Sequence, residues 1–213
     1  MGTPKAALGW PGGTLLSRTV AVLAGATGGP VVVVRAAGQS LPPLPESVLV
    51  VADPRPGLGP LQGIAAGLAV LATFVAQAGA EPPRVAFVAA TDMPFLHPAF
   101  VRRVLAIQQA DGADIALPVA LGHAQPLAAA YLVALAPVAD ALVAAGKLRP
   151  ADLFATATVR VTRPDAARLL DRAERGGADL AAADPELDSL INVNEPGEYA
   201  AALSRAAAPD RAR

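Results

Sequence analysis

Three short runs of β-branched residues constrain the fold more than any other feature of this sequence. They lie at residues 31–34, 48–51 and 85–88, and each run ends at a small or polar residue. Apolar runs of this length are typical of strands that are buried on both faces. Alanine- and leucine-rich stretches with helical spacing lie between and after them, at residues 15–26, 61–76 and 98–109. Strand and helix therefore alternate, which predicts βαβ units with helices on both faces of a mainly parallel sheet.

The pattern changes after residue 113. Residues 115–119 and 127–132 are expected to form two further strands around a turn at Gly122, and residues 159–161 a short one. Residues 36–46 contain one glycine and three prolines, which predicts an extended loop rather than a regular element.

Helices are expected from about Ala134 and Ala166, and a C-terminal helix from Pro196 to about Ala206 is expected to close the sheet. The predicted architecture is an α/β fold, a three-layer sandwich around a mainly parallel, mixed sheet. We expect a single domain over residues 1–206, followed by a disordered tail at residues 207–213.

Composition limits the classes of partner. Lysine and arginine number 17 against 18 aspartate and glutamate residues, so no net field attracts polyanions. The chain has no cysteine and only two histidines, which leaves carboxylates as the candidate ligands for a hard cation. Apolar runs are too short to cross a membrane, and the first eight residues lack the pattern of a signal peptide. We therefore expect no nucleic-acid or membrane partner and a cytoplasmic location.

Asp92 is the first candidate site residue, because it lies in the stretch at residues 91–96 that directly follows the apolar strand expected at residues 84–90. In open α/β sheets, ligands bind beyond the carboxyl ends of strands, so a carboxylate at this place is suited to hold Mg²⁺. The alternative is that Asp92 caps the helix that begins near Pro98 or bonds loop amides. Spacing alone does not separate the two interpretations.

The second candidate is the loop from Asp53 to Gly63, which again follows a buried strand. Glycines at positions 57, 59 and 63 permit close approach of the backbone to a ligand, and a helix begins at its end. This pattern fits a loop that contacts a nucleotide. It fits equally a tight connection in which glycine serves the turn geometry.

Two further stretches carry polar side chains that suit ligand binding. Lys5 lies beside glycine and proline ahead of an apolar helix and could pair with a triphosphate, although an isolated lysine is usually a solvated surface residue. Asn192 and Asn194 alternate along an extended segment, and amides can read a heterocycle. Asn194 could equally be the N-cap of the helix that follows. His97 and His123 have no obvious catalytic partners in the sequence and are interpreted as loop or core residues.

Taken together, four motifs in this order resemble the molybdenum-cofactor guanylyltransferase family, a MobA-like member of the nucleotide-diphospho-sugar transferase type of Rossmann-like fold. They are MG-x-PKA-x-L at the start, D-x(5)-GPLxG at residues 53–63, TDMPFL at residues 91–96 and the late NVNEP. The resemblance spans essentially the whole chain. It implies transfer of GMP from GTP to the phosphate of molybdopterin with release of pyrophosphate, and implies partner proteins that deliver or accept molybdopterin.

The resemblance also implies a role for each matching residue. Lys5 matches the lysine that contacts phosphate, and Asp92 matches the Mg²⁺ ligand. Asp53 matches the acidic residue near the nucleotide base, with Gly59 and Gly63 in the same loop. Asn192 and Asn194 match the two asparagines that the family places on the molybdopterin side of the site.

Two departures from the family pattern affect these expectations. The family pattern begins with a buried strand and a glycine-rich loop that holds the triphosphate, whereas this sequence starts at the methionine of that motif, which points to a wrongly assigned start codon. Without that strand, neighbouring strands are expected to lack a partner. Secondly, Arg35 stands where relatives have an asparagine that reads the base. Two alternatives therefore remain, namely a related enzyme that uses CTP or another triphosphate and a catalytically inactive nucleotide-binding or docking module.

Overall fold

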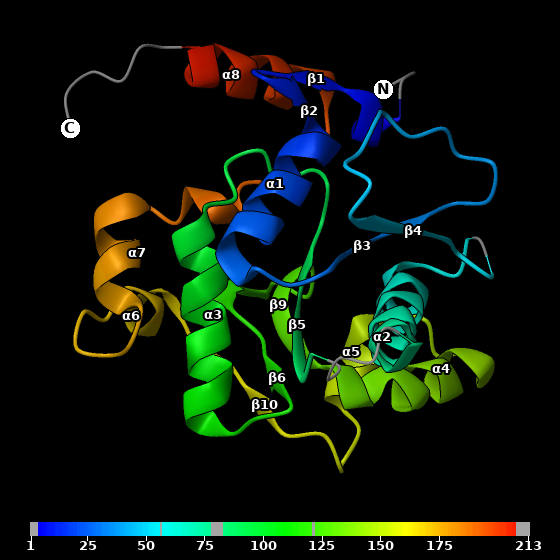
Figure 1. The fold of residues 1–213 in the computed structure, drawn as a ribbon. Helices are drawn as coiled ribbons and strands as arrows, with labels where there is room; N and C mark the ends of the chain where they lie inside the picture. Colours follow the sequence, from blue (N-terminus) through cyan, green and yellow to red (C-terminus); the bar gives the residue numbers. More distant parts are fainter. Residues whose placement is uncertain (1–3, 56, 78–82, 121, 208–213) are drawn as a thin grey trace.

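A computed structural model describes residues 4–55, 57–77, 83–120 and 122–207, and Figure 1 shows their arrangement. The strands are β1 (Gly9–Trp10), β2 (Gly13–Thr14), β3 (Val31–Arg35), β4 (Val48–Ala52), β5 (Val85–Ala89), β6 (Ile115–Ala116), β7 (Val119–Ala120), β8 (His123–Ala124), β9 (Ala128–Leu132) and β10 (Val161–Thr162). The α-helices are α1 (Leu15–Thr27), α2 (Pro60–Gln77), α3 (Pro98–Asp111), α4 (Ala136–Ala144), α5 (Pro150–Phe154), α6 (Ala166–Leu169), α7 (Gly177–Ala183) and α8 (Pro196–Ala207). Short 3₁₀ turns are η1 (Lys5–Ala7), η2 (Val133–Leu135) and η3 (Asp188–Leu190).

The helices cover the strands on two sides. Helices α1, α3 and α7 lie on one side of β5 and β9, and α2, α4 and α5 lie on the other (Figure 1). This arrangement confirms the predicted α/β fold with a mixed sheet. Within the described ranges, no helix is long and apolar enough to span a bilayer.

Strand β9 shows how one short segment contributes to both helical layers. Ala129 and Tyr131 belong to the core on the α2 and α4 side, whereas Ala128 and Ala130 belong to the core on the α3 side. This alternation follows from the two-residue period of side chains along a strand. The small alanine side chains leave room for the helices to pack close to the sheet.

The sheet is divided into two parts among the described residues. Strands β10, β6, β9 and β5 form one sheet in that order, and β3 pairs in parallel with β4 in another. Strand β5 is antiparallel to β9, which makes the larger sheet mixed. Among the described residues, β3 and β5 do not pair with each other.

Six of the predicted strands and helices match the structure closely, and the later elements differ in detail. The predicted strand at residues 115–119 is divided, because β6 ends at Ala116 and β7 begins only after Pro118, which cannot donate to a ladder. The short strand lies at Val161–Thr162, and the helix expected from Ala166 has only four residues. The turn at Gly122 is present, with the glycine at a φ of 76°.

The C-terminal helix does not close the sheet, so this part of the prediction was wrong. Helix α8 instead packs on the β1–β2 hairpin, in a cluster that includes Trp10, Val193 and Ala202 (Figure 1). The apolar face of α8 is buried against this hairpin, at a distance from the central strands. The helix includes Ala207, which was expected to begin the tail, and residues 208–213 lie outside the described part of the chain.

Candidate functional site

Asp92 lies in the loop that leaves the carboxyl end of β5, and this loop is anchored on both sides. Met93 and Leu96 are buried in the core next to α3. The guanidinium of Arg18, on α1, donates hydrogen bonds to the carbonyl oxygens of Pro94 and Leu96. The backbone N–H of Val193 donates to the carbonyl oxygen of Asp92 at 2.9 Å. The carboxylate is therefore presented by a constrained backbone.

Lys5, Asp92 and Asn194 come together at this point. The Lys5 ammonium lies 2.7 Å from Oδ2 of Asp92 and 2.7 Å from Oδ1 of Asn194. The Lys5 side chain is 35% exposed and that of Asp92 is 20% exposed, so the group is open to a ligand. Lys5 is thus not the solitary solvated lysine of the alternative interpretation. The cluster is polar, accessible and built from three distant segments.

The alternative role of Asp92 as a helix cap is not what the structure shows. The ring Nδ1 of His97 accepts the hydrogen bond from the backbone N–H of Ala99 and caps α3. His97 is therefore a structural residue, in agreement with its interpretation as a loop residue.

Asn194 is likewise not the N-cap of α8. Glu198, in the first turn of α8, accepts hydrogen bonds from the backbone N–H groups of Asn194 and Glu195, at 2.7 and 3.1 Å. These two bonds lower the pKa of the Glu198 carboxyl below its usual range. Because Glu198 satisfies the start of the helix, the amide of Asn194 is left to face Lys5.

A second group of candidate residues lies at the ends of β3 and β4. The carboxylate of Asp53 accepts from the backbone N–H of Arg55 at 2.9 Å, which closes a local turn. The Arg35 guanidinium donates to the carbonyl oxygen of Gln39 at 2.7 Å. Gly59 has a φ of 81°, a conformation that favours glycine, so it meets a turn requirement in this loop. Asp53 is at present engaged in the turn, as the alternative interpretation of this loop expects.

The structure does not bring every candidate into the Lys5 cluster. Gly63 lies in α2 and lines an apolar cavity rather than the cluster. The side chain of Asn192 is exposed and donates a long hydrogen bond, 3.4 Å, to the carbonyl oxygen of Leu190. Its neighbour Val193 is buried, so Asn192 and Asn194 project to the same exposed side of this segment.

Sequence reasoning missed two residues that support the cluster. Glu198 had a usable signal, because a glutamate at the third position of a helix is typical of a capping box. Arg18 had none, because its partners are backbone oxygens 76 and 78 positions away.

The oxygen atoms around Lys5 fit a divalent cation held jointly with a nucleotide. In the described part of the chain, no three or more histidine, cysteine or acidic side chains gather into a metal site. Mg²⁺ is commonly held by only one or two carboxylates together with substrate phosphates. Asp92 supplies one such carboxylate, and the amide oxygen of Asn194 lies near it, since both contact the same ammonium.

The fold is that of the nucleotidyltransferases. A molybdopterin-guanine dinucleotide biosynthesis protein A from Archaeoglobus fulgidus superposes with a TM-score of 0.66 at 20% identity, covering 96% of this chain and 91% of that one. A 2-C-methyl-D-erythritol 4-phosphate cytidylyltransferase from Thermus thermophilus superposes with a TM-score of 0.61 at 20% identity, covering 95% and 93%. At these identities the similarity concerns the fold alone.

Sequence similarity narrows this class to one family. Residues 1–161 match the MobA-like NTP transferase domain, and the chain belongs to that family. A probable molybdenum cofactor guanylyltransferase from Mycobacterium tuberculosis is 39% identical over 168 residues, which cover 78% of each chain. One from Mycobacterium ulcerans is 39% identical over 171 residues, covering 79% of this chain and 80% of that one. The chain is thus a nucleotidyltransferase similar to the molybdenum cofactor guanylyltransferases.

Proposed function

We propose that this chain transfers GMP from GTP to molybdopterin. The observation that carries the proposal is the convergence of Lys5, Asp92 and Asn194 at the carboxyl end of β5. That edge is where ligands bind in open α/β sheets. The relatives at 39% identity, which are named as probable molybdenum cofactor guanylyltransferases, support this substrate pair.

In the proposed reaction, an oxygen of the molybdopterin phosphate attacks the α-phosphorus of GTP. A phosphorus–oxygen bond forms, the bond from that phosphorus to the β-phosphate's bridging oxygen breaks, and its electron pair leaves with pyrophosphate. Lys5 can exchange its two present oxygen partners for phosphate oxygens and stabilise the charge on them. Asp92 would hold Mg²⁺, which when bound supplies further charge neutralisation on the phosphates. No covalent intermediate with the enzyme is needed.

The remaining candidates are assigned to the two substrates. Arg35, Asp53, Gly59 and Gly63 belong to the nucleotide side, because they lie along β3, β4 and the start of α2. Asn192 and Asn194 belong to the pterin side. Glu198 acts as a positioning residue, since it holds the backbone of Asn194 and leaves its amide directed at Lys5. A cytoplasmic location and a protein that hands over molybdopterin remain predictions.

The test is release of pyrophosphate from GTP, Mg²⁺ and molybdopterin by the chain, and by the same chain extended through the in-frame codons before Met1. Replacement of Asp92 by asparagine should lower the rate about 100-fold, because a charged partner of the phosphates is lost. The matched control is Asp179→Asn, an exposed carboxylate in the first turn of α7, which should leave the rate unchanged. Wild-type turnover by Asp92→Asn, or no pyrophosphate release by either chain, would contradict the proposal, and the second result would favour an inactive binding module.

A second candidate is a related enzyme that uses CTP or another triphosphate. Arg35 favours it, because a guanidinium held by the Gln39 carbonyl stands at the carboxyl end of β3, where the family has an asparagine. Thermal unfolding with each of the four triphosphates and Mg²⁺ separates the two candidates, because a bound ligand raises the apparent melting temperature. We expect the largest rise with GTP, and a larger rise with CTP would favour the second candidate.

A further inference from the structure

One apolar face of α8 packs against the segments that supply the Lys5 cluster. The helix lies along the β1–β2 hairpin at one end of the molecule (Figure 1). Its apolar residues are spaced three and four apart, which places them on one side of the helix, and they are Tyr199, Ala202, Leu203 and Ala206. They pack with Trp10, Phe95 and Val193. These three residues belong, in that order, to the segments that carry Lys5, Asp92 and Asn194.

The first turn of α8 holds two of these segments by hydrogen bonds. Glu198 accepts from the backbone N–H groups of Asn194 and Glu195. Tyr199 is the next residue, and its hydroxyl donates to the carbonyl oxygen of Gly9. Adjacent side chains of one helix thus hold two of the three segments of the Lys5 cluster.

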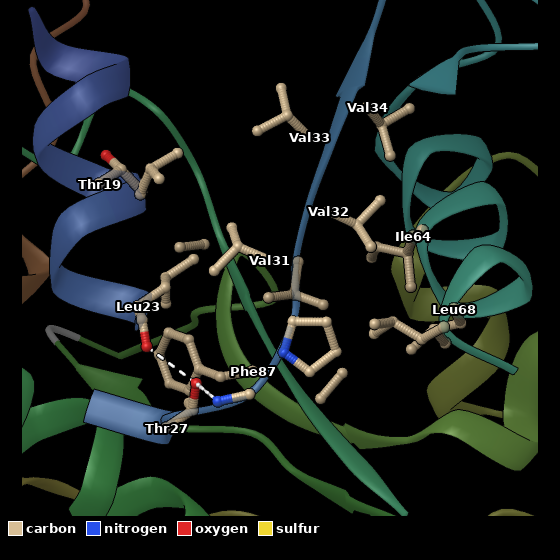
Figure 2. A pocket seen from close by; sticks show the side chains of 18 of the residues that line it. Thr19, Leu23, Thr27, Val31, Val32, Val33, Val34, Ile64, Leu68 and Phe87 are labelled. Atoms are coloured by element: carbon tan, nitrogen blue, oxygen red, sulfur yellow. Dashed lines mark hydrogen bonds between the residues drawn. The ribbon is translucent and has the colours of Figure 1, made fainter. Parts of the chain in front are cut away.

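The segment from Lys5 to Gly9 is short and internally bonded. The backbone N–H of Leu8 donates to the carbonyl oxygen of Lys5 at 3.2 Å and closes the turn η1. Ala6, inside this turn, is buried in a cluster with residues of α1 and with Val33 of β3, which points toward α1 in Figure 2. The core therefore anchors one side of this segment, and α8 holds the other side through the carbonyl of Gly9.

The last turn of α8 reaches the segment of Asp92. The Arg205 guanidinium lies over the ring of Phe95, 4.6 Å from its centre, where the aromatic face attracts a cation. Phe95 is three residues after Asp92, and the ring of Trp10 packs edge-on against it at 5.7 Å. Arg205 is itself oriented by the carboxylate of Asp188, to which it donates at 3.0 Å. Helix α8 therefore contacts each of the three segments of the Lys5 cluster.

We propose that α8 assembles the Lys5 cluster and that Tyr199 is a positioning residue for Lys5. Tyr199 acts through the backbone of Gly9 and keeps the Lys5 ammonium between its two oxygen partners. When a nucleotide is bound, the same restraint keeps the ammonium on the phosphates. This effect on the nucleotide rests on the proposed function, whereas the restraint on Lys5 does not.

The restraint on Lys5 is measurable by NMR without any ligand. The chain has two lysines, Lys5 and the exposed Lys147, so isotope-labelled lysine gives one ammonium signal for each. In the wild type, nitrogen relaxation should show the Lys5 ammonium to be more restricted than that of Lys147. We expect Tyr199→Phe, which removes only the hydroxyl, to lower the order parameter of the Lys5 ammonium by about one third. The signal of Lys147 should not change.

The matched control is Tyr131→Phe, which also removes a hydroxyl that donates to a backbone carbonyl, that of Pro126 at 2.8 Å. Tyr131 lies in the core on the α2 and α4 side. Its replacement should lower the stability and leave the Lys5 signal as in the wild type, which separates a general loosening of the fold from loss of the Tyr199 contact. Equal mobility of Lys5 and Lys147 in the wild type, an unchanged Lys5 signal in Tyr199→Phe, or equal changes in the two variants would overturn the proposal.

The consequence for the nucleotide is tested with GTP, Mg²⁺ and molybdopterin. We expect Tyr199→Phe to raise the KM for GTP about fivefold and to leave kcat within about twofold, because a hydrogen bond that orients a binding group is lost. A smaller folded fraction would instead lower kcat and leave KM unchanged.

A second substitution shows whether Tyr199 acts through Lys5. In a Lys5→Met background, Tyr199→Phe should add no further rise in KM, because the group that it positions is absent. A full fivefold rise in that background would overturn the positioning role. If the wild-type chain releases no pyrophosphate, the proposed function fails, and the mobility of the Lys5 ammonium still decides the positioning role.

Discussion

Arg103 is a charged residue in the core whose role can be tested alone. It is 1% exposed on α3, and its guanidinium donates to the carbonyl oxygens of Leu169 and Arg175 and to the carboxylate of Glu174, each at 2.9 Å. Methionine at this position would keep much of the volume but would leave these acceptors unpaired. We expect Arg103→Met to lower the free energy of unfolding by about 3 kcal/mol, measured by urea denaturation.

The control for this change is the neighbouring residue Arg102, which is exposed on the same helix. Arg102→Met should change the free energy of unfolding by no more than about 0.5 kcal/mol. Equal effects of the two substitutions would show that the buried hydrogen bonds of Arg103 do not stabilise the fold.

Asp111 gives the stability a defined dependence on pH. Its carboxylate accepts from the Arg168 guanidinium at 2.7 and 2.8 Å, and this hydrogen bond lowers the pKa of Asp111 below its ordinary value. A carboxyl group with a lowered pKa in the folded state stabilises the fold above its unfolded pKa of about 3.9. That contribution is lost as the pH falls through the lower, folded pKa.

We therefore expect the wild-type free energy of unfolding to fall more steeply below about pH 4 than that of Asp111→Asn. The difference should be about 1 kcal/mol or less, because both side chains are partly exposed to solvent. Urea denaturation at a series of pH values measures it. Parallel curves for the two proteins would contradict the assignment.

At the scale of single elements, Gly177 at the start of α7 is sterically required. A Cβ atom at this position would lie 1.6 Å from the carbonyl oxygen of Asp171, so the preceding loop would have to move. We expect Gly177→Ala to destabilise the protein by about 2 kcal/mol in thermal or urea unfolding. Gly25, in α1, is the control, because no atom outside its local helix lies within 4 Å of an added Cβ. Gly25→Ala should stabilise by about 0.5–1 kcal/mol, and the same sign for both would refute the steric explanation.

The elements that the sequence predicted correctly are those whose own residues carry a strong period. The valine runs of β3, β4 and β5 and the apolar periods of α1, α2 and α3 are local signals. The β1–β2 hairpin was not predicted, because its two-residue strands are held by distant contacts, such as the ring of Trp10 packed edge-on at 5.7 Å from that of Phe95. The position of α8 depends on this same hairpin and could not be derived from its own amphipathic pattern.

The site is understandable only at the scale of the whole molecule. Lys5 and Asp92 were both candidates from their local motifs, but their contact joins positions 87 apart, and that with Asn194 joins positions 189 apart. No period or spacing in the sequence reports such a distance. The role of Arg18 was missed because it acts on backbone groups of another segment, which carry no signature in side-chain type. Glu198 acts on backbone groups only three and four positions away, so its capping pattern was present in the sequence and was overlooked.

The divided sheet predicts uneven stability across the molecule. The pair β3–β4 is joined to the larger sheet by no ladder within the described residues, whereas β9 is paired on both edges. We expect amides of Val31–Arg35 to exchange at least about tenfold faster than those of Ala128–Leu132. Mass-spectrometric hydrogen exchange measures both segments in one experiment. Equal protection would show that the two sheets unfold together.

The contact between Lys5 and Asp92 means that the carboxylate already has a resident counter-ion. On the proposed function, a triphosphate would offer the Lys5 ammonium other oxygen partners, and Oδ2 of Asp92 would then be free to hold a divalent ion. Nucleotide and metal would then favour each other's binding by equal factors, since linkage is reciprocal. The nucleotide alone or the metal ion alone would compete with the ion pair between Lys5 and Asp92. Binding of both together should therefore be needed to reach the active arrangement.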